Sequence, residues 1–284
     1  MAQGFRLDIS VYLDRSLVHG NDLDTLQDLL IARAPGWSQG LQVWRNYEAK
    51  IPIDVKTPGE LARTLRSLAE AATAVNIRYW QTNEPPAGLR PERVMGSEEL
   101  RGANPSLILI IDLDDVVFRP IGNTWIWGNS IAIQICRARV EGASAPQWAH
   151  DLFVALCGAL SPVHAKACMS GEYATKNISH EGGGTRAIGI DRSSSLPGLY
   201  WLNFVGRSYR DFIGLDKLST APAFEAREIG DGVLIGLADD PRSWSTPEYQ
   251  RRERAVLDHI GTEYFFDRSQ PDRRTTAPPF KFSR

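Results

Sequence analysis

The chain has 284 residues, which is enough for one large domain or two small ones. Its hydrophobic content of 43% and charged content of 23% are typical of a globular protein, and its net charge of −2 gives no reason to expect a nucleic-acid or membrane partner. The N-terminus lacks an apolar signal segment, and the longest aliphatic run is 107–111. We therefore expect a cytoplasmic protein, with reduced thiols at Cys136, Cys157 and Cys168.

Strand patterns recur along the whole chain. Residues 5–13 alternate apolar and polar side chains, as in a strand with one wet face. Strands are predicted over 5–13, 41–45, 51–55, 75–80, 106–113, 124–127, 131–140, 163–169, 199–206, 223–228, 233–237 and 264–266. Gly128-Asn129 and Gly230-Asp231-Gly232 predict hairpin turns.

Helix start and stop signals separate these strands. Helices are predicted over 22–34, 57–73, 145–160, 207–213 and 246–260. Residues 81–104 are rich in Pro, Gly and polar residues and predict a long surface excursion, and 171–195 predicts an irregular segment.

The order of these elements predicts an α+β protein with an antiparallel-rich sheet and flanking helices. A similar order of elements around 22–80 and 207–266 suggests two structurally similar halves, 1–160 and 161–267. Residues 268–284 form a basic, Pro-containing tail. A loosely held tail is the favoured interpretation, and the alternative is a strap docked through Phe280 and Phe282.

The segment 196–214 reads LPGLYWLNFVGRSYRDFIG and predicts a strand buried on both faces, followed by a short helix that ends at Gly214. Asn203 is the polar side chain inside this strand, so we expect it to find hydrogen-bond partners.

The pattern PGLYWLNFxGxxYxxxIG in this segment resembles the signature of the immunity protein 52 family of bacterial polymorphic-toxin systems. The type VI secretion immunity family is a more distant likeness. The resemblance implies a cytoplasmic protein that neutralises a nuclease-type toxin of the restriction-endonuclease-like class. It implies no enzyme activity, no catalytic residues, no metal and no cofactor, and no direct contact with nucleic acid or membrane.

The segment 107–118, LILIIDLDDVVF, indicates a different function. It resembles the first motif of haloacid dehalogenase-like phosphatases, in which Asp112 would be the nucleophile, Asp114 the acid/base, and both could hold Mg²⁺. Against this, about a hundred residues precede the motif and no parallel βαβ series follows it. Asp114 and Asp115 are better interpreted as capping the end of the strand, or as a partner-facing acidic patch.

Several side chains are candidates for contact with a partner. Trp125 and Trp127 alternate on one side of a strand close to the acids Asp114 and Asp115 and suit a binding hot spot, although core packing is the favoured interpretation of both tryptophans. Glu181 begins a glycine-rich loop that could rest on a partner. These five residues are the predicted partner-binding residues.

The remaining candidates for chemistry have simpler interpretations. His164 and Lys166 share a strand face and are expected on a wet side of the sheet. Cys157 and Cys168 have no neighbouring base in the sequence. A structural subunit of a secretion apparatus is a third possible function.

Overall fold

The computed structural model describes residues 6–15, 17, 21–33, 41–45, 49–55, 63, 74–80, 107–114, 118–121, 124–127, 129–135, 145–180 and 184–280. The strands between 41 and 127 are described by their backbone alone. The predicted helix over 57–73 lies outside this description apart from Arg63, which is helical, and so do the predicted excursion 81–104 and Phe282.

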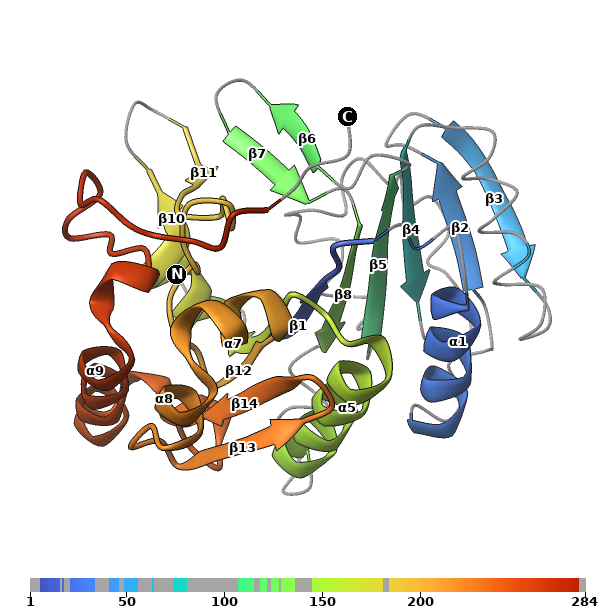
Figure 1. The fold of residues 1–284 in the computed structure, drawn as a ribbon. Helices are drawn as coiled ribbons and strands as arrows, with labels where there is room; N and C mark the ends of the chain where they lie inside the picture. Colours follow the sequence, from blue (N-terminus) through green and yellow to red (C-terminus); the bar gives the residue numbers. More distant parts are fainter. Residues whose placement is uncertain are drawn as a thin grey trace.

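The described residues form an α+β fold around one eight-stranded antiparallel sheet (Figure 1). The strand order is β13-β14-β12-β9-β1-β8-β5-β4. The strands are β1 (Leu7–Tyr12), β4 (Ala74–Trp80), β5 (Leu107–Asp114), β8 (Ser130–Ile135), β9 (His164–Met169), β12 (Leu202–Val205), β13 (Glu225–Ile229) and β14 (Gly232–Gly236). The predicted fold class is confirmed.

Three two-stranded sheets accompany the large one. They pair β2 (Leu41–Arg45) with β3 (Ala49–Val55), β6 (Phe118–Ile121) with β7 (Thr124–Trp127), and β10 (Ile178–Ser179) with β11 (Arg186–Ala187). The helices are α1 (Asp22–Arg33), α5 (Ala145–Leu160), α6 (Ser170–Asn177), α7 (Arg207–Ile213), α8 (Leu215–Ser219) and α9 (Pro247–Ile260), with 3-10 turns at Pro241–Ser245 and Thr262–Tyr264. Helix α6 lies in a stretch that was predicted to be irregular, and that prediction is wrong.

The two faces of the sheet differ in polarity because β1 alternates. Leu7, Ile9 and Val11 are fully buried and pack in one apolar core with the inner sides of α1 and α5 (Figure 1). Asp8, Ser10 and Tyr12 lie on the opposite face and are half-buried. The second face is therefore polar.

The aromatic segment before β12 is part of the core, as predicted. Tyr200 and Trp201 are buried, and the indole N–H of Trp201 donates to Ala238 O at 2.9 Å. The Asn203 amide accepts from Tyr200 N at 2.9 Å and donates to Tyr200 O at 2.8 Å and to Ile235 O at 3.2 Å. The buried amide is satisfied, so its role in this strand is structural.

One predicted strand pairing and one predicted strand are wrong. Residues 124–127 were expected to form a hairpin with 131–140, but β7 pairs with β6, and β8 pairs with β1 and β5. The reason lies at Asn129, whose carbonyl accepts from Leu13 N at 3.1 Å and whose side chain accepts from Leu17 N at 3.0 Å. Residues 264–266 make only an isolated bridge, between Leu196 and Phe265.

The C-terminal segment is attached to the domain, so the favoured interpretation of a loosely held tail is wrong for the described residues up to 280. Thr276 N donates to Glu263 O at 2.9 Å, and the Phe280 ring packs on Tyr209 with centroids 5.8 Å apart. The segment crosses the molecule as a strap (Figure 1). Strands from both sides of residue 161 share the large sheet, through the pairing of β1 with β9.

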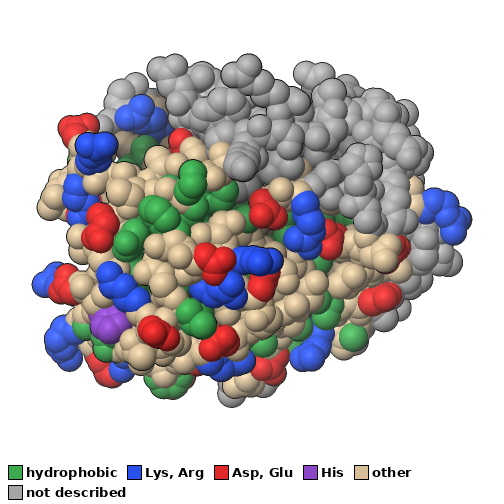
Figure 2. All heavy atoms as spheres, viewed as in Figure 1, with side chains coloured by type: hydrophobic (Ala, Val, Ile, Leu, Met, Phe, Trp, Pro, Cys, Tyr) green, Lys and Arg blue, Asp and Glu red, His purple; other side chains and the backbone are tan. Residues whose placement is uncertain are grey.

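The described surface is mixed in charge. Figure 2 shows Lys and Arg side chains interspersed with Asp and Glu on the face that it presents. The large exposed apolar side chains among the described residues are Phe212 and Phe224, at 41% and 54% exposure. Phe212, on α7, packs edge-on against Tyr264 at the surface.

Candidate functional site

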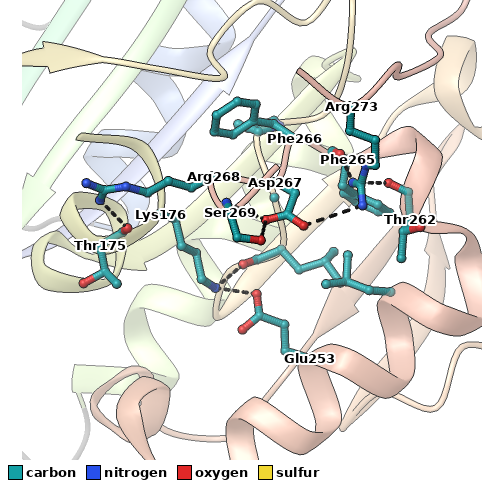
Figure 3. A pocket seen from close by; sticks show the side chains of 14 residues that line it. Thr175, Lys176, Glu253, Thr262, Phe265, Phe266, Asp267, Arg268, Ser269 and Arg273 are labelled. Carbon is teal, nitrogen blue, oxygen red and sulfur yellow. Dashed lines mark hydrogen bonds and ion pairs between the residues drawn. The ribbon is translucent and has the colours of Figure 1, made fainter. Parts of the chain in front are cut away.

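A cavity of about 560 Å³ lies between α6, α9 and the segment that follows the second 3-10 turn (Figure 3). Its charged lining comes from three separate parts of the chain, which the fold brings together. The charged residues around it are Lys176, Glu253, Asp267, Arg268 and Arg273.

Lys176 lines this cavity and also forms an ion pair with the buried Glu172. Its ammonium lies 2.9 Å from Glu172 Oε1 and 2.7 Å from Glu253 Oε1, and Figure 3 shows Lys176 and Glu253 pointing toward one another. Glu172 has no solvent exposure and also accepts from the Tyr249 hydroxyl at 2.6 Å. Burial lowers the pKa of Lys176, but the two carboxylates raise it by more, so the lysine stays charged.

Two arginines on the other wall of the cavity are held by backbone carbonyls. Arg273 donates to Thr262 O at 2.7 Å and to Phe265 O at 2.8 Å, and Arg268 donates to Thr175 O at 2.8 Å (Figure 3). A second cavity, of about 420 Å³, shares Phe266, Asp267 and Arg273 with the first. The segment that contains these three residues therefore borders both cavities.

The polar face of the sheet holds a second cluster of functional groups. On β1 and β9, Asp8 is opposite Cys168, Ser10 is opposite Lys166, and Tyr12 is opposite His164. The three β9 side chains are buried, so the predicted wet face at His164 and Lys166 is wrong.

Arg192 is one of the groups that cover this face. Its guanidinium carbon lies 3.3 Å from the centroid of the Tyr12 ring, and its Nε donates to His164 Nδ1 at 3.3 Å. Lys166 is enclosed by aromatic rings, with its ammonium 3.6 Å from the centroid of Tyr173 and 4.4 Å from that of Tyr200. The cluster therefore combines two buried cations with the faces of three tyrosines.

These surroundings shift several pKa values. Burial, then Arg192 and Lys166, hold the pKa of His164 well below 6.5, so its imidazole is neutral. Burial raises the pKa of the Tyr12 phenol, while the same two cations and a hydrogen bond with Ser10 together lower it by more, so it lies below 10.0. Burial raises the pKa of Cys168 to about 12, which makes its thiol a poor nucleophile.

The described side chains form no metal centre. No group of three or more His, Cys, Asp or Glu residues with the arrangement of metal ligands occurs among them. No helix in the described part of the chain has the length and apolar character that a bilayer crossing requires.

Comparison with known proteins gives one informative result. No family model matches the chain, and no curated protein matches it. Among solved structures, the Pseudomonas aeruginosa T6SS protein PA0821 is similar, with a TM-score of 0.51 and 13% sequence identity. The likeness covers 92% of this chain and 73% of that one, and at this identity it shows a shared fold.

The residues predicted to bind a partner are described only in part. Asp114 ends β5, and Trp125 and Trp127 lie in β7, where their backbone partners in β6 are Pro120 and Phe118. Asp115 and Glu181 lie outside the described residues. The partner-binding role of all five therefore stays a prediction.

Asp112 lies in the same row of paired residues across the sheet as Tyr12 and His164. It pairs with Ser130, which pairs with Tyr12, which pairs with His164. This row connects the acidic motif of β5 to the polar face described above. Sequence reasoning missed Tyr12 and Arg192, although the alternation of β1 and β9 could have indicated that their polar sides coincide.

Proposed function

We propose that this chain is a cytoplasmic immunity protein that binds and neutralises a nuclease-type toxin of a type VI secretion or polymorphic-toxin system. The observation that carries the proposal is that the likeness to a T6SS protein extends over nearly the whole chain, 92% of it. The resemblance to the immunity protein 52 family rests on the aromatic segment 196–214. The strand part of this segment, 196–206, lies in the core, as a segment that identifies a family through its fold should.

The proposed mechanism is occlusion rather than chemistry. A preformed surface covers the cleft of the toxin or the path by which its substrate enters, and affinity comes from a few buried aromatic side chains and local charge pairs. A net charge of −2 is too small for an overall acidic field to attract a basic nuclease, so complementarity is local. Trp125 and Trp127, with Asp114, Asp115 and Glu181, are the proposed contacts.

Co-expression with the toxin encoded beside this chain tests the proposal. The wild-type protein should protect cells, and Asp112→Asn should protect equally, because no phosphoryl chemistry is involved. Mg²⁺-dependent hydrolysis of a phosphate ester that Asp112→Asn abolishes would instead favour the phosphatase. Co-purification with a secretion apparatus, without protection, would favour a structural subunit.

The contact residues need a separate measurement on the purified complex. Trp125→Ala and Trp127→Ala should each weaken toxin binding by about tenfold or more, as expected of aromatic hot spots. Phe224→Ala is the matched control, because it removes an exposed aromatic ring from a different part of the surface. If Trp125→Ala and Trp127→Ala bind the toxin as tightly as Phe224→Ala does, β7 is excluded as the contact surface.

A further inference from the structure

Two buried cations on the polar face of the sheet form no ion pair with any acid in the part of the chain that the structure describes. Lys166 and Arg192 are each 4% exposed. Among the residues that the structure describes, no carboxylate forms an ion pair with either of them. The acids of this region form their ion pairs with other cations, since Asp8 lies 2.7 Å from Arg6 and Glu172 lies 2.9 Å from Lys176. Asp8 also interacts with Lys166 at longer range, without an ion pair between the two side chains.

Such an arrangement is costly for the folded protein. A buried charge loses its hydration, and a partner of opposite charge is the usual compensation. Here the faces of Tyr12, Tyr173 and Tyr200 return only part of that cost, because a cation–π contact is weaker than a buried ion pair. The cluster therefore keeps positive charge that is only partly compensated, and a bound anion would neutralise it.

The geometry leaves hydrogen-bond donors for one small anion. Arg192 uses its Nε on His164 Nδ1 and its Nη1 on Ile190 O, and neither acceptor is charged at neutral pH. Among the described residues, the ammonium of Lys166 has only the Cys168 sulfur, 3.9 Å away, as a hydrogen-bond acceptor. His164 and Lys166 are two residues apart on one face of β9, roughly 7 Å along the strand, a spacing that one oxyanion can bridge.

The cluster is also not sealed. Ser10 and Tyr12, which lie opposite Lys166 and His164 on β1, are only half-buried. We propose that Arg192 and Lys166 form a binding site for a small oxyanion, a phosphate or carboxylate group, which reaches them past Ser10 and Tyr12. The guanidinium fork binds such a group through two parallel hydrogen bonds, and the lysine supplies the second charge. This site is independent of toxin binding.

Thermal unfolding of the full chain tests this site with inorganic phosphate and with acetate. The anions are used at about 10 mM against chloride at equal ionic strength, too dilute for general salt stabilisation. Phosphate or acetate should raise Tm by roughly 5 °C when its concentration is about 100-fold above Kd. A response to phosphate alone assigns a phosphate group, and a response to acetate alone assigns a carboxylate.

Arg192→Gln should abolish the response, whereas Arg186→Gln should retain it. Arg186 is the matched control because it is an exposed arginine in β11, six residues before Arg192. No increase in Tm with either anion, or an equal increase in both variants, would overturn the proposal.

Lys166→Met provides a second test should Arg192→Gln not fold. It removes an uncompensated charge and keeps most of the side-chain volume, so Tm in chloride should equal or exceed that of the wild type. The response to the anion should be lost. A Lys166→Met protein that is less stable than the wild type in chloride, or that still responds to the anion, contradicts the proposal.

Discussion

The ammonium of Lys176 lies 2.9 Å from a carboxylate oxygen of Glu172, a side chain with no exposure to solvent. Removing this lysine would leave the buried carboxylate with the Tyr249 hydroxyl as its only donor among the described residues. Lys176→Met should therefore lower the free energy of unfolding by about 3–5 kcal/mol, measured by urea denaturation.

The control for that prediction is an exposed ion pair. Arg207 lies 3.8 Å from Asp211 on the surface of α7, with 73% of its side chain exposed. Arg207→Met should change the free energy of unfolding by less than about 0.5 kcal/mol. If the two variants lose the same stability, the pair of Lys176 with Glu172 has no special structural role.

Gly206 is predicted to tolerate no side chain. A Cβ at this position would lie 1.9 Å from Pro162 O and 2.7 Å from Val163 O, both in the backbone that leads into β9. Gly206→Ala should destabilise the protein by about 3 kcal/mol or more, because backbone cannot move aside as a flexible side chain can. Gly184→Ala, where a Cβ meets nothing within 4 Å, is the control and should leave Tm nearly unchanged.

His164 should make the stability depend on pH. Its imidazole stays neutral in the folded protein, while in the unfolded chain it binds a proton near pH 6.5. The unfolded state therefore binds more protons as the pH falls below 6.5, and stability should decrease by about 1.4 kcal/mol for each pH unit in that window. Above pH 6.5 the imidazole is neutral in both the folded and the unfolded state, so His164 no longer makes the stability depend on pH.

Variants identify His164 as the source of that slope. Urea denaturation at several pH values should show the slope reduced in His164→Gln and retained in His180→Gln, since His180 is exposed at the surface. A wild-type slope that persists without His164 would assign the effect to another group.

The thiols of Cys157 and Cys168 should be unreactive in the folded protein. Burial raises the pKa of both, that of Cys168 to about 12. In a Cys136→Ser background, an aromatic disulfide reagent should detect no thiol at neutral pH until denaturant is added, and two thiols afterwards. Rapid labelling of the native protein would show that this part of the sheet opens locally.

The sequence was sufficient to predict much of the sheet and of its helices. Alternation in β1, the capping signal at Thr246 and the turn at Gly230 are local features, and each produced the expected element. The pairing of β7 could not be predicted, because Asn129 is held by the backbone of residues 13 and 17, far away in the sequence.

The candidate site was harder to predict for a physical reason. His164 and Lys166 alternate with small alanines, which indicates one wet face when β9 is considered alone. In the folded chain Arg192 and Tyr173 cover that face, and they come from segments whose packing the local pattern does not encode. Burial of a polar face depends on what docks against it, and that is a tertiary property.

The central position of β1 also has a consequence for synthesis. Among the strands of the large sheet β1 comes first in the sequence, yet its neighbours β8 and β9 begin only at residues 130 and 164. One edge of β1 therefore stays unpaired until β8 has been made, and the other until β9 has been made. Sheet formation must await that late arrival, so the nascent chain passes through a long interval in which a chaperone could hold it.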